Sequence, residues 1–160
     1  MLSIQISDIK DFMSHLLSKD TFDHFYFIEA SIKMGVSYQI QGRINEGFYD
    51  TSVEQTLNRE FCYWKEIRHR IFDIIKGKRL PLSCKIVLGL SKQSISYLIA
   101  HNNSSFREED IKGIYVNILY DPKNLLITTG ISYKNFSLDK SLEYAFDEYL
   151  AKFLKEKAVI

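Results

Sequence analysis

The sequence predicts an α+β fold in which antiparallel strands are covered by helices. Segments with alternating apolar and polar residues are interspersed with segments whose apolar residues recur every three or four positions. Two pairs of predicted strands are joined by short turns, as in antiparallel hairpins. The order strand, helix, strand, strand, helix occurs twice. We therefore expect residues 1–160 to form a single domain of two pseudo-repeats, 1–79 and 80–157.

The first pseudo-repeat is expected to open with a short strand over 2–6. Ser7 is then placed to N-cap a helix over 8–18. The apolar stripe of this helix is Ile9, Phe12, Met13, Leu16 and Leu17. A hairpin follows, with strands over 24–34 and 36–44. Alternation places Tyr26, Ile28, Ala30 and Ile32 on one face of the first strand. On the second strand, the residues that share a face are Tyr38, Ile40 and Ile44.

A long helix over 53–76 is expected to close the first pseudo-repeat. Two overlapping capping-box patterns mark its start: Thr51 with Glu54, and Ser52 with Gln55. Gly77 and Pro81 follow its end, and proline prevents the helix from resuming. Its predicted apolar face is Leu57, Phe61, Trp64, Ile71, Phe72 and Ile75.

The second pseudo-repeat is expected to begin with a strand over 82–90, with one face formed by Leu82, Cys84, Ile86, Leu88 and Leu90. Ser91 is placed to cap a helix that ends at His101, and a polar loop over 102–110 follows. Strands over 112–120 and 125–133 are joined by Asp121-Pro122-Lys123-Asn124, a favourable type I turn. The last helix, over 139–157, is expected to bury Leu142, Phe146, Tyr149, Leu150 and Phe153.

Composition and motifs exclude several classes of protein. The net charge of +1 comes from 21 basic and 20 acidic residues, which argues against a dedicated nucleic-acid binder. Cys62 and Cys84 are too few for a disulfide framework, and no histidine or cysteine spacing matches a metal site. There is no phosphate-binding glycine motif, so no cofactor is expected. Without a signal peptide or a spanning segment, we expect a cytoplasmic protein with no membrane association.

The four histidines and the two cysteine thiols are expected to be structural. Each of the four histidines is predicted to be a surface or strand residue. Cys84 is predicted to act as a small hydrophobic residue, and Cys62 to be partly exposed on its helix. No partner marks either thiol as a nucleophile. We therefore expect no catalytic residue among them, and the sequence favours a non-enzymatic role.

Arg68 falls in the middle of the apolar stripe of the long predicted helix. A buried guanidinium needs a carboxylate, carbonyl groups or a route to water. The favoured interpretation is a structural ion pair or a side chain that extends to the surface. The alternative is an arginine that binds an anion at the floor of a cleft between the two halves.

A run of basic residues extends from this helix into the following loop. If the protein binds a polyanion, we predict that the contacts are made by these residues: Lys65, Arg68, His69, Lys76, Lys78 and Arg79. Cations near the C-terminus of a helix are also favoured by the helix dipole, so the run has a purely structural explanation as well.

Three stretches carry a resemblance to a known family: ISDIKDFMSHLLSKDTFDHF (6–25), IIKGKRLPLSCKIV (74–87) and TTGISYKNFSLDKSLEYAFDE (128–148). Together they resemble a family of small proteins of unknown function from clostridia and related Firmicutes. The resemblance implies a bacterial cytoplasmic protein, and it implies no activity.

The order of elements also resembles one domain of a DNA sliding clamp, in which helices line a ring and sheets lie outside. The two helices that would line the ring, 8–18 and 92–101, lack the positive charge that encircling DNA requires. The resemblance therefore implies a clamp-like topology, and the charge argues against clamp function.

These observations support two main functional hypotheses. The first is a non-enzymatic binding or interaction module that self-associates and contacts nucleic acid or another polyanion through the basic run. The alternative is an enzyme or a small acidic-ligand binder, with a cleft between the halves anchored by Arg68. A purely structural subunit of a larger assembly is a third possibility.

Overall fold

One six-stranded antiparallel sheet forms the body of the protein in the computed structural model, which describes residues 1–49 and 59–160. The strands are β1 (Ser3–Gln5), β2 (Tyr26–Lys33), β3 (Ser37–Gln41), β4 (Ser83–Gly89), β5 (Ile111–Tyr120) and β6 (Leu125–Tyr133). Their order in the sheet is β1-β6-β5-β4-β2-β3, and every neighbouring pair is antiparallel.

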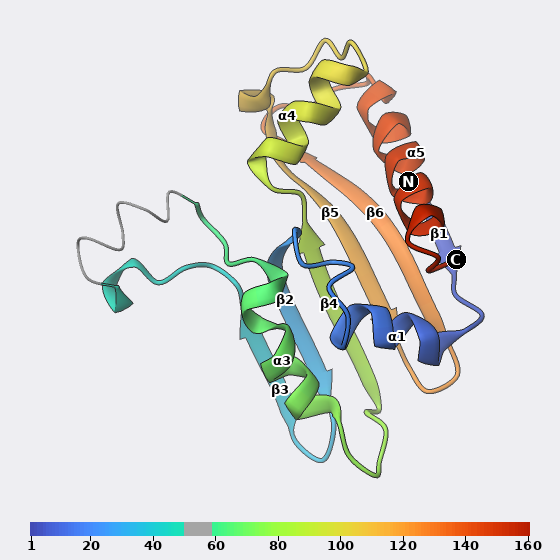
Figure 1. Cartoon of the computed structure of the whole chain (residues 1–160). Helices are drawn as coiled ribbons and strands as arrows, with labels where there is room; N and C mark the ends of the chain where they lie inside the picture. The colour runs from blue at the N-terminus through green and yellow to red at the C-terminus, as the bar shows by residue number, and fades with distance from the viewer. Residues whose placement is uncertain (50–58) are drawn as a thin grey trace.

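The helices lie on one face of this sheet (Figure 1). In the described residues they are α1 (Ile9–Leu17), α3 (Trp64–Ile75), α4 (Lys92–His101) and α5 (Ser141–Glu156). Two short 3-10 helices, η1 (Glu46–Phe48) and η2 (Glu108–Asp110), lie in the connections. The predicted α+β class, with an antiparallel sheet covered by helices, is confirmed. In the described part of the chain, no helix is both long and apolar enough to cross a membrane.

The core lies between the sheet and the helices, and the register of the strands builds it. One row across the sheet pairs Ala30 with Ile86, Ile86 with Ile118, and Ile118 with Ile127. All four side chains are buried. The next row along, which points to the other face, pairs Ser31 with Lys85 and Lys85 with Leu119. Because side chains alternate along a strand, the uncovered face is more polar than the covered face.

The predicted tandem of two equivalent halves is not confirmed. The elements do follow one another along the chain in the predicted order. In the second half, β4, β5 and β6 lie side by side, whereas in the first half β1 is separated from β2 and β3. β1 instead pairs with β6 at the opposite edge of the sheet. The two halves therefore contribute differently ordered strands to one sheet.

Several local predictions are wrong at the ends of elements. Asp8, not Ser7, caps α1, because its carboxylate accepts a hydrogen bond from the Asp11 N–H. β3 ends at Gln41, so Ile44 lies outside it. Leu82 precedes β4 and is 69% exposed, although alternation grouped it with buried residues.

The register of β2 also differs from simple alternation. A β-bulge between Phe27 and Glu29 inserts one extra residue. It places Phe27, rather than Ile28, in the core with Ala30. The face predicted for this strand is therefore correct at Ala30 and Ile32 and wrong at Tyr26 and Ile28.

The helix predicted over 53–76 is much shorter where it is described. Residues 50–58, with both predicted capping boxes and Leu57, lie outside the described residues, and α3 begins only at Trp64. Phe61 and Tyr63 form isolated bridges to Arg43 and Tyr26. Phe61 is therefore not on the apolar face of a helix, as predicted. The backbone of this segment pairs with neighbouring strands instead of forming helical hydrogen bonds.

The start of α3 is fixed by Glu66. Its carboxylate accepts hydrogen bonds from the Tyr63 N–H at 2.6 Å and from both terminal nitrogens of Arg59 at 2.6 and 2.9 Å. The hydrogen bond from Arg59, above all, lowers the pKa of Glu66 from its ordinary value of 4.5. The ionised carboxylate therefore holds the preceding segment against the first turn of the helix.

Glu66→Gln is expected to lower the free energy of unfolding by about 0.5–1 kcal/mol at pH 7, a small effect because the carboxylate is 39% exposed. Since the pKa is lower in the folded state, the stabilisation is complete above the unfolded pKa and is lost as the pH falls through the folded pKa. Urea unfolding of both proteins at several pH values should show the difference shrinking towards acid pH. A difference that is the same at pH 7 and pH 3 would contradict this role.

Candidate functional site

An apolar groove lies between α1 and α3, at the end of the sheet where β5 turns into β6. Its volume is about 510 Å³. The apolar side chains that line it are Ile9, Met13, Leu17, Phe72, Ile75, Leu80, Pro81, Tyr120 and Pro122. We call this site the α1–α3 groove. It is a preformed concave surface with the apolar lining typical of binding sites.

The local sequence explains why the groove stays open. α3 ends at Ile75, and Gly77 has a φ of 150°, a conformation that favours glycine. Pro81 then directs the chain into β4. The turn leaves Leu80 68% exposed beside Phe72, which is 36% exposed. The two helices therefore present apolar side chains beyond those that the core buries, and such exposed apolar surface marks interaction sites.

The charged side chains that line the groove are all cationic in the described part of the chain: Lys10 from α1 and Lys76 at the end of α3. Lys78 and Arg79 lie in the loop between the lining residues Gly77 and Leu80, and both are exposed. Lys76 also contacts Asp73 at 2.9 Å, but both side chains are more than half exposed, so this pair is weak. The described lining of the groove thus combines an apolar floor with two cations.

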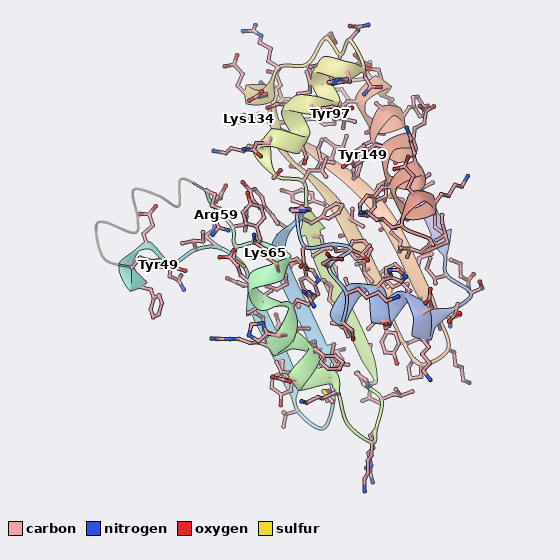
Figure 2. All side chains as sticks on the ribbon, in the orientation of Figure 1. Tyr49, Arg59, Lys65, Tyr97, Lys134 and Tyr149 are labelled. Atoms are coloured by element: carbon pink, nitrogen blue, oxygen red, sulfur yellow. The ribbon has the colours of Figure 1, made fainter. Side chains whose placement is uncertain are left out.

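The structure separates the predicted basic residues into three groups. Lys76, Lys78 and Arg79 flank the α1–α3 groove. Lys65 and His69 are exposed on α3, and Lys65 lies at its first turn, 5.7 Å from the ring of Tyr63 (Figure 2). With a rise of about 1.5 Å per residue, Lys65 is roughly 16 Å along the helix from Lys76. The six residues therefore do not form one compact patch.

Arg68, the third group, forms an ion pair with Asp23. Its Nε donates to Asp23 Oδ1 at 2.8 Å and its Nη2 to Asp23 Oδ2 at 3.1 Å. Nη1 also donates to the carbonyl of Leu17 at 3.3 Å. The side chains are 22% and 14% exposed. This bidentate geometry matches the structural interpretation of Arg68 and ties α3 to the segment that follows α1.

The thiols have the environment of structural residues. Burial raises the pKa of Cys62 to about 11 and that of Cys84 to about 12. Both are therefore protonated at neutral pH and are poor nucleophiles. Cys62 is half-buried and precedes α3 rather than lying on a helix.

One prediction for the histidines is wrong. His15 is buried on α1, with Nδ1 2.9 Å from the hydroxyl of Thr21, whereas His24, His69 and His101 are exposed. The neighbouring hydroxyl satisfies the polar ring, which explains how it is buried. Among the residues that the structure describes, no group of three or more potential ligands could hold a metal ion.

Sequence reasoning identified the cations at the end of α3 but missed the groove beside them. Ile9, Met13 and Leu17 have the spacing of core residues, and only their position opposite α3 shows that they line a surface site. One signal was present in the sequence. Leu80-Pro81-Leu82 places two large apolar residues in a turn, where polar residues are usual.

The fold and the groove define a two-layer α+β protein with a preformed apolar site edged by cations. The chain belongs to the family described as a family of unknown function (DUF5721), whose model matches residues 15–160. No curated protein and no solved structure showed a significant match to the chain.

Proposed function

We propose that this protein is a non-enzymatic, bacterial cytosolic binding module whose α1–α3 groove holds a short acidic and apolar segment of a partner protein. The observation that carries the proposal is the combination of an apolar lining with charged lining residues that are cationic, Lys10 and Lys76. An amphipathic segment with apolar anchors and acidic flanks complements both features.

The shape of the groove supports a peptide segment. Two helices side by side, α1 and α3, form its walls, and the exposed side chains of Phe72 and Leu80 stand at its edge. Grooves of this kind bind amphipathic helices through anchors spaced three or four residues apart. We expect two or three such anchors to supply most of the binding energy.

The charge distribution favours an acidic peptide over nucleic acid. Nucleic-acid binding depends on neutralising many phosphates, and it gains little from an apolar floor. Among the described residues, two cations line the groove, Lys10 and Lys76, and Lys78 and Arg79 lie in the adjacent loop. Arg68, which anchored the alternative small-ligand hypothesis, donates to Asp23 instead.

Selection from a random peptide library on the full chain tests the proposal. We expect the recovered peptides to contain two or three large apolar residues flanked by Asp and Glu. Leu80→Asp should weaken their binding at least tenfold, because it places a carboxylate on the apolar edge. Leu82→Asp is a matched control, since Leu80 and Leu82 are 68% and 69% exposed. Fluorescence anisotropy measures both affinities.

Recovery of peptides that bind the two variants equally would contradict the proposal, and so would recovery of none.

A titration with single-stranded and double-stranded DNA and RNA at two salt concentrations tests the remaining polyanion hypothesis. Tight nucleic-acid binding that is lost steeply with salt would replace the peptide proposal.

A further inference from the structure

A second groove, larger than the first, opens between the two halves of the chain. Its volume is about 1020 Å³. The segment around the bridge of Arg43 and Phe61 forms one side. The first turn of α4, η2 and the adjoining ends of β5 and β6 form the other. We call it the interhalf groove. Arg68 is not among its lining residues.

The acidic side chains of the interhalf groove already have partners. Glu60 forms an ion pair with Arg43, and Glu109 forms one with Arg107 at 3.0 Å. Glu108 accepts a hydrogen bond from the hydroxyl of Ser96. The carboxylates are therefore matched by cations or donors from the protein itself.

Three lysines in the same groove have no such partners within the described residues. Lys92, Lys112 and Lys134 line the groove, and none forms an ion pair with a described residue. They come from three separate elements: the first turn of α4, the start of β5 and the residue after β6 (Figure 2 labels Lys134). The described lining residues include five cations and three carboxylates, an excess of two positive charges.

The backbone is irregular at this site. Ile111 pairs with Tyr133 and Gly113 with Ser132, so Lys112 is the extra residue of a β-bulge. Bulges at the end of a strand redirect side chains and are common beside functional sites. Lys134 follows β6 directly, and its N–H donates to the carbonyl of Asp110 in η2 at 2.9 Å. The bulge and this hydrogen bond hold Lys112 and Lys134 where the start of β5 adjoins the end of β6.

Aromatic rings complete the lining. Phe61 and Tyr115 both line the groove, and the guanidinium of Arg43 lies 5.2 Å from the ring centre of Phe61. A Cβ at Gly113 would lie 2.2 Å from the Tyr115 hydroxyl, so this side chain lies over Gly113 along β5. The groove therefore offers flat apolar surface next to uncompensated positive charge.

We infer that the interhalf groove binds a small organic phosphate with at least two negative charges, whose ring contacts Phe61 or Tyr115. Lysines act as point charges for phosphate groups, and an aromatic face can pack against a planar base or the apolar face of a sugar ring. The volume is sufficient for a molecule the size of a nucleotide or a sugar phosphate. This site and the α1–α3 groove share none of their lining residues.

Thermal unfolding and isothermal titration of the full chain test the inference with four probes: inorganic phosphate, pyrophosphate, ribose 5-phosphate and a nucleoside triphosphate. At about one hundred times its Kd, the best probe should raise Tm by roughly 5 °C or more. We expect ribose 5-phosphate or the nucleoside triphosphate to give a larger shift than pyrophosphate. The shift should fall as the ionic strength rises.

The triple variant Lys92→Ala, Lys112→Ala, Lys134→Ala should weaken binding of the best probe at least tenfold. Its matched control is Lys33→Ala, Lys85→Ala, Lys123→Ala, which removes the same charge from exposed positions outside the groove. Equal losses in the two triple variants would overturn the inference, as would the absence of any shift at about 5 mM of every probe. Pyrophosphate that binds as tightly as both ring-containing probes would overturn the ring contact.

Discussion

Trp64→Ala is expected to lower the free energy of unfolding by about 3–5 kcal/mol. Trp64 is the first residue of α3 and is fully buried. Its ring lies 5.7 Å from that of Phe27 on β2, and its Nε1–H donates to the carbonyl of Leu16 at 2.8 Å. One side chain thus joins α3, α1 and the sheet. Its removal leaves a large cavity and an unsatisfied carbonyl.

Urea unfolding followed by far-ultraviolet circular dichroism measures this change. Fluorescence is unsuitable because Trp64 is the single tryptophan of the chain. Trp64→Phe should cost less, since it keeps an aromatic ring and removes the hydrogen bond. Tyr97→Ala, at a position that is 55% exposed on α4, should change stability by no more than about 0.5 kcal/mol. A loss below about 1 kcal/mol for Trp64→Ala would contradict its role in the core.

Asp23→Ala is expected to destabilise the protein by about 2–3 kcal/mol, because it leaves the guanidinium of Arg68 largely buried without its carboxylate. The effect is smaller than the ~3–5 kcal/mol for a fully buried pair because Arg68 and Asp23 are 22% and 14% exposed. The double variant Asp23→Ala, Arg68→Met should cost less than the sum of the two single changes, since neither charge is then left alone.

A double-mutant cycle by urea unfolding measures this coupling, and anisotropy with the selected peptides gives the second measurement. The ion-pair role predicts a coupling above about 1 kcal/mol and an unchanged peptide affinity in the folded Arg68→Met protein. Additive stability changes together with lost ligand binding would instead show that Arg68 belongs to a binding site.

The regular elements of the second half were predicted almost completely from residue periodicity. β6 has the predicted limits of 125–133, and Ser91 caps α4 as expected, because its hydroxyl accepts from the Ser94 N–H. Asp121 accepts hydrogen bonds from Lys123 and Asn124 in the predicted turn. These features depend on residues close in the sequence, so a local pattern suffices to identify them.

The start of α3 could not be predicted because distant residues determine it. Phe61 and Trp64 have helical spacing, yet the Cys62 N–H donates to the carbonyl of Gly42, and the Trp64 N–H donates to that of Phe25. These hydrogen bonds to residues next to the ends of β3 and β2 replace those of a longer helix. The pairing of β1 with β6 is likewise a tertiary contact, and the repeated order of elements does not specify it.

The candidate site was predicted only in part, for the same reason. Periodicity placed Arg68 on an apolar face, where its guanidinium needs a carboxylate, carbonyl groups or a route to water. It could not identify Asp23, which is 45 residues away. The cations at 76–79 were identified, but the apolar groove beside them forms only when α1 packs against α3. Sites that combine several elements require the tertiary structure.

Amide chemical-shift mapping with a peptide selected on the protein tests the central proposal most directly. The α1–α3 groove predicts that the largest changes will fall on residues 9–18, 72–81 and 120–122, with little change on α4 and η2. Changes concentrated on α4, η2 or the uncovered face of the sheet would show that the peptide binds elsewhere and would contradict the proposed function.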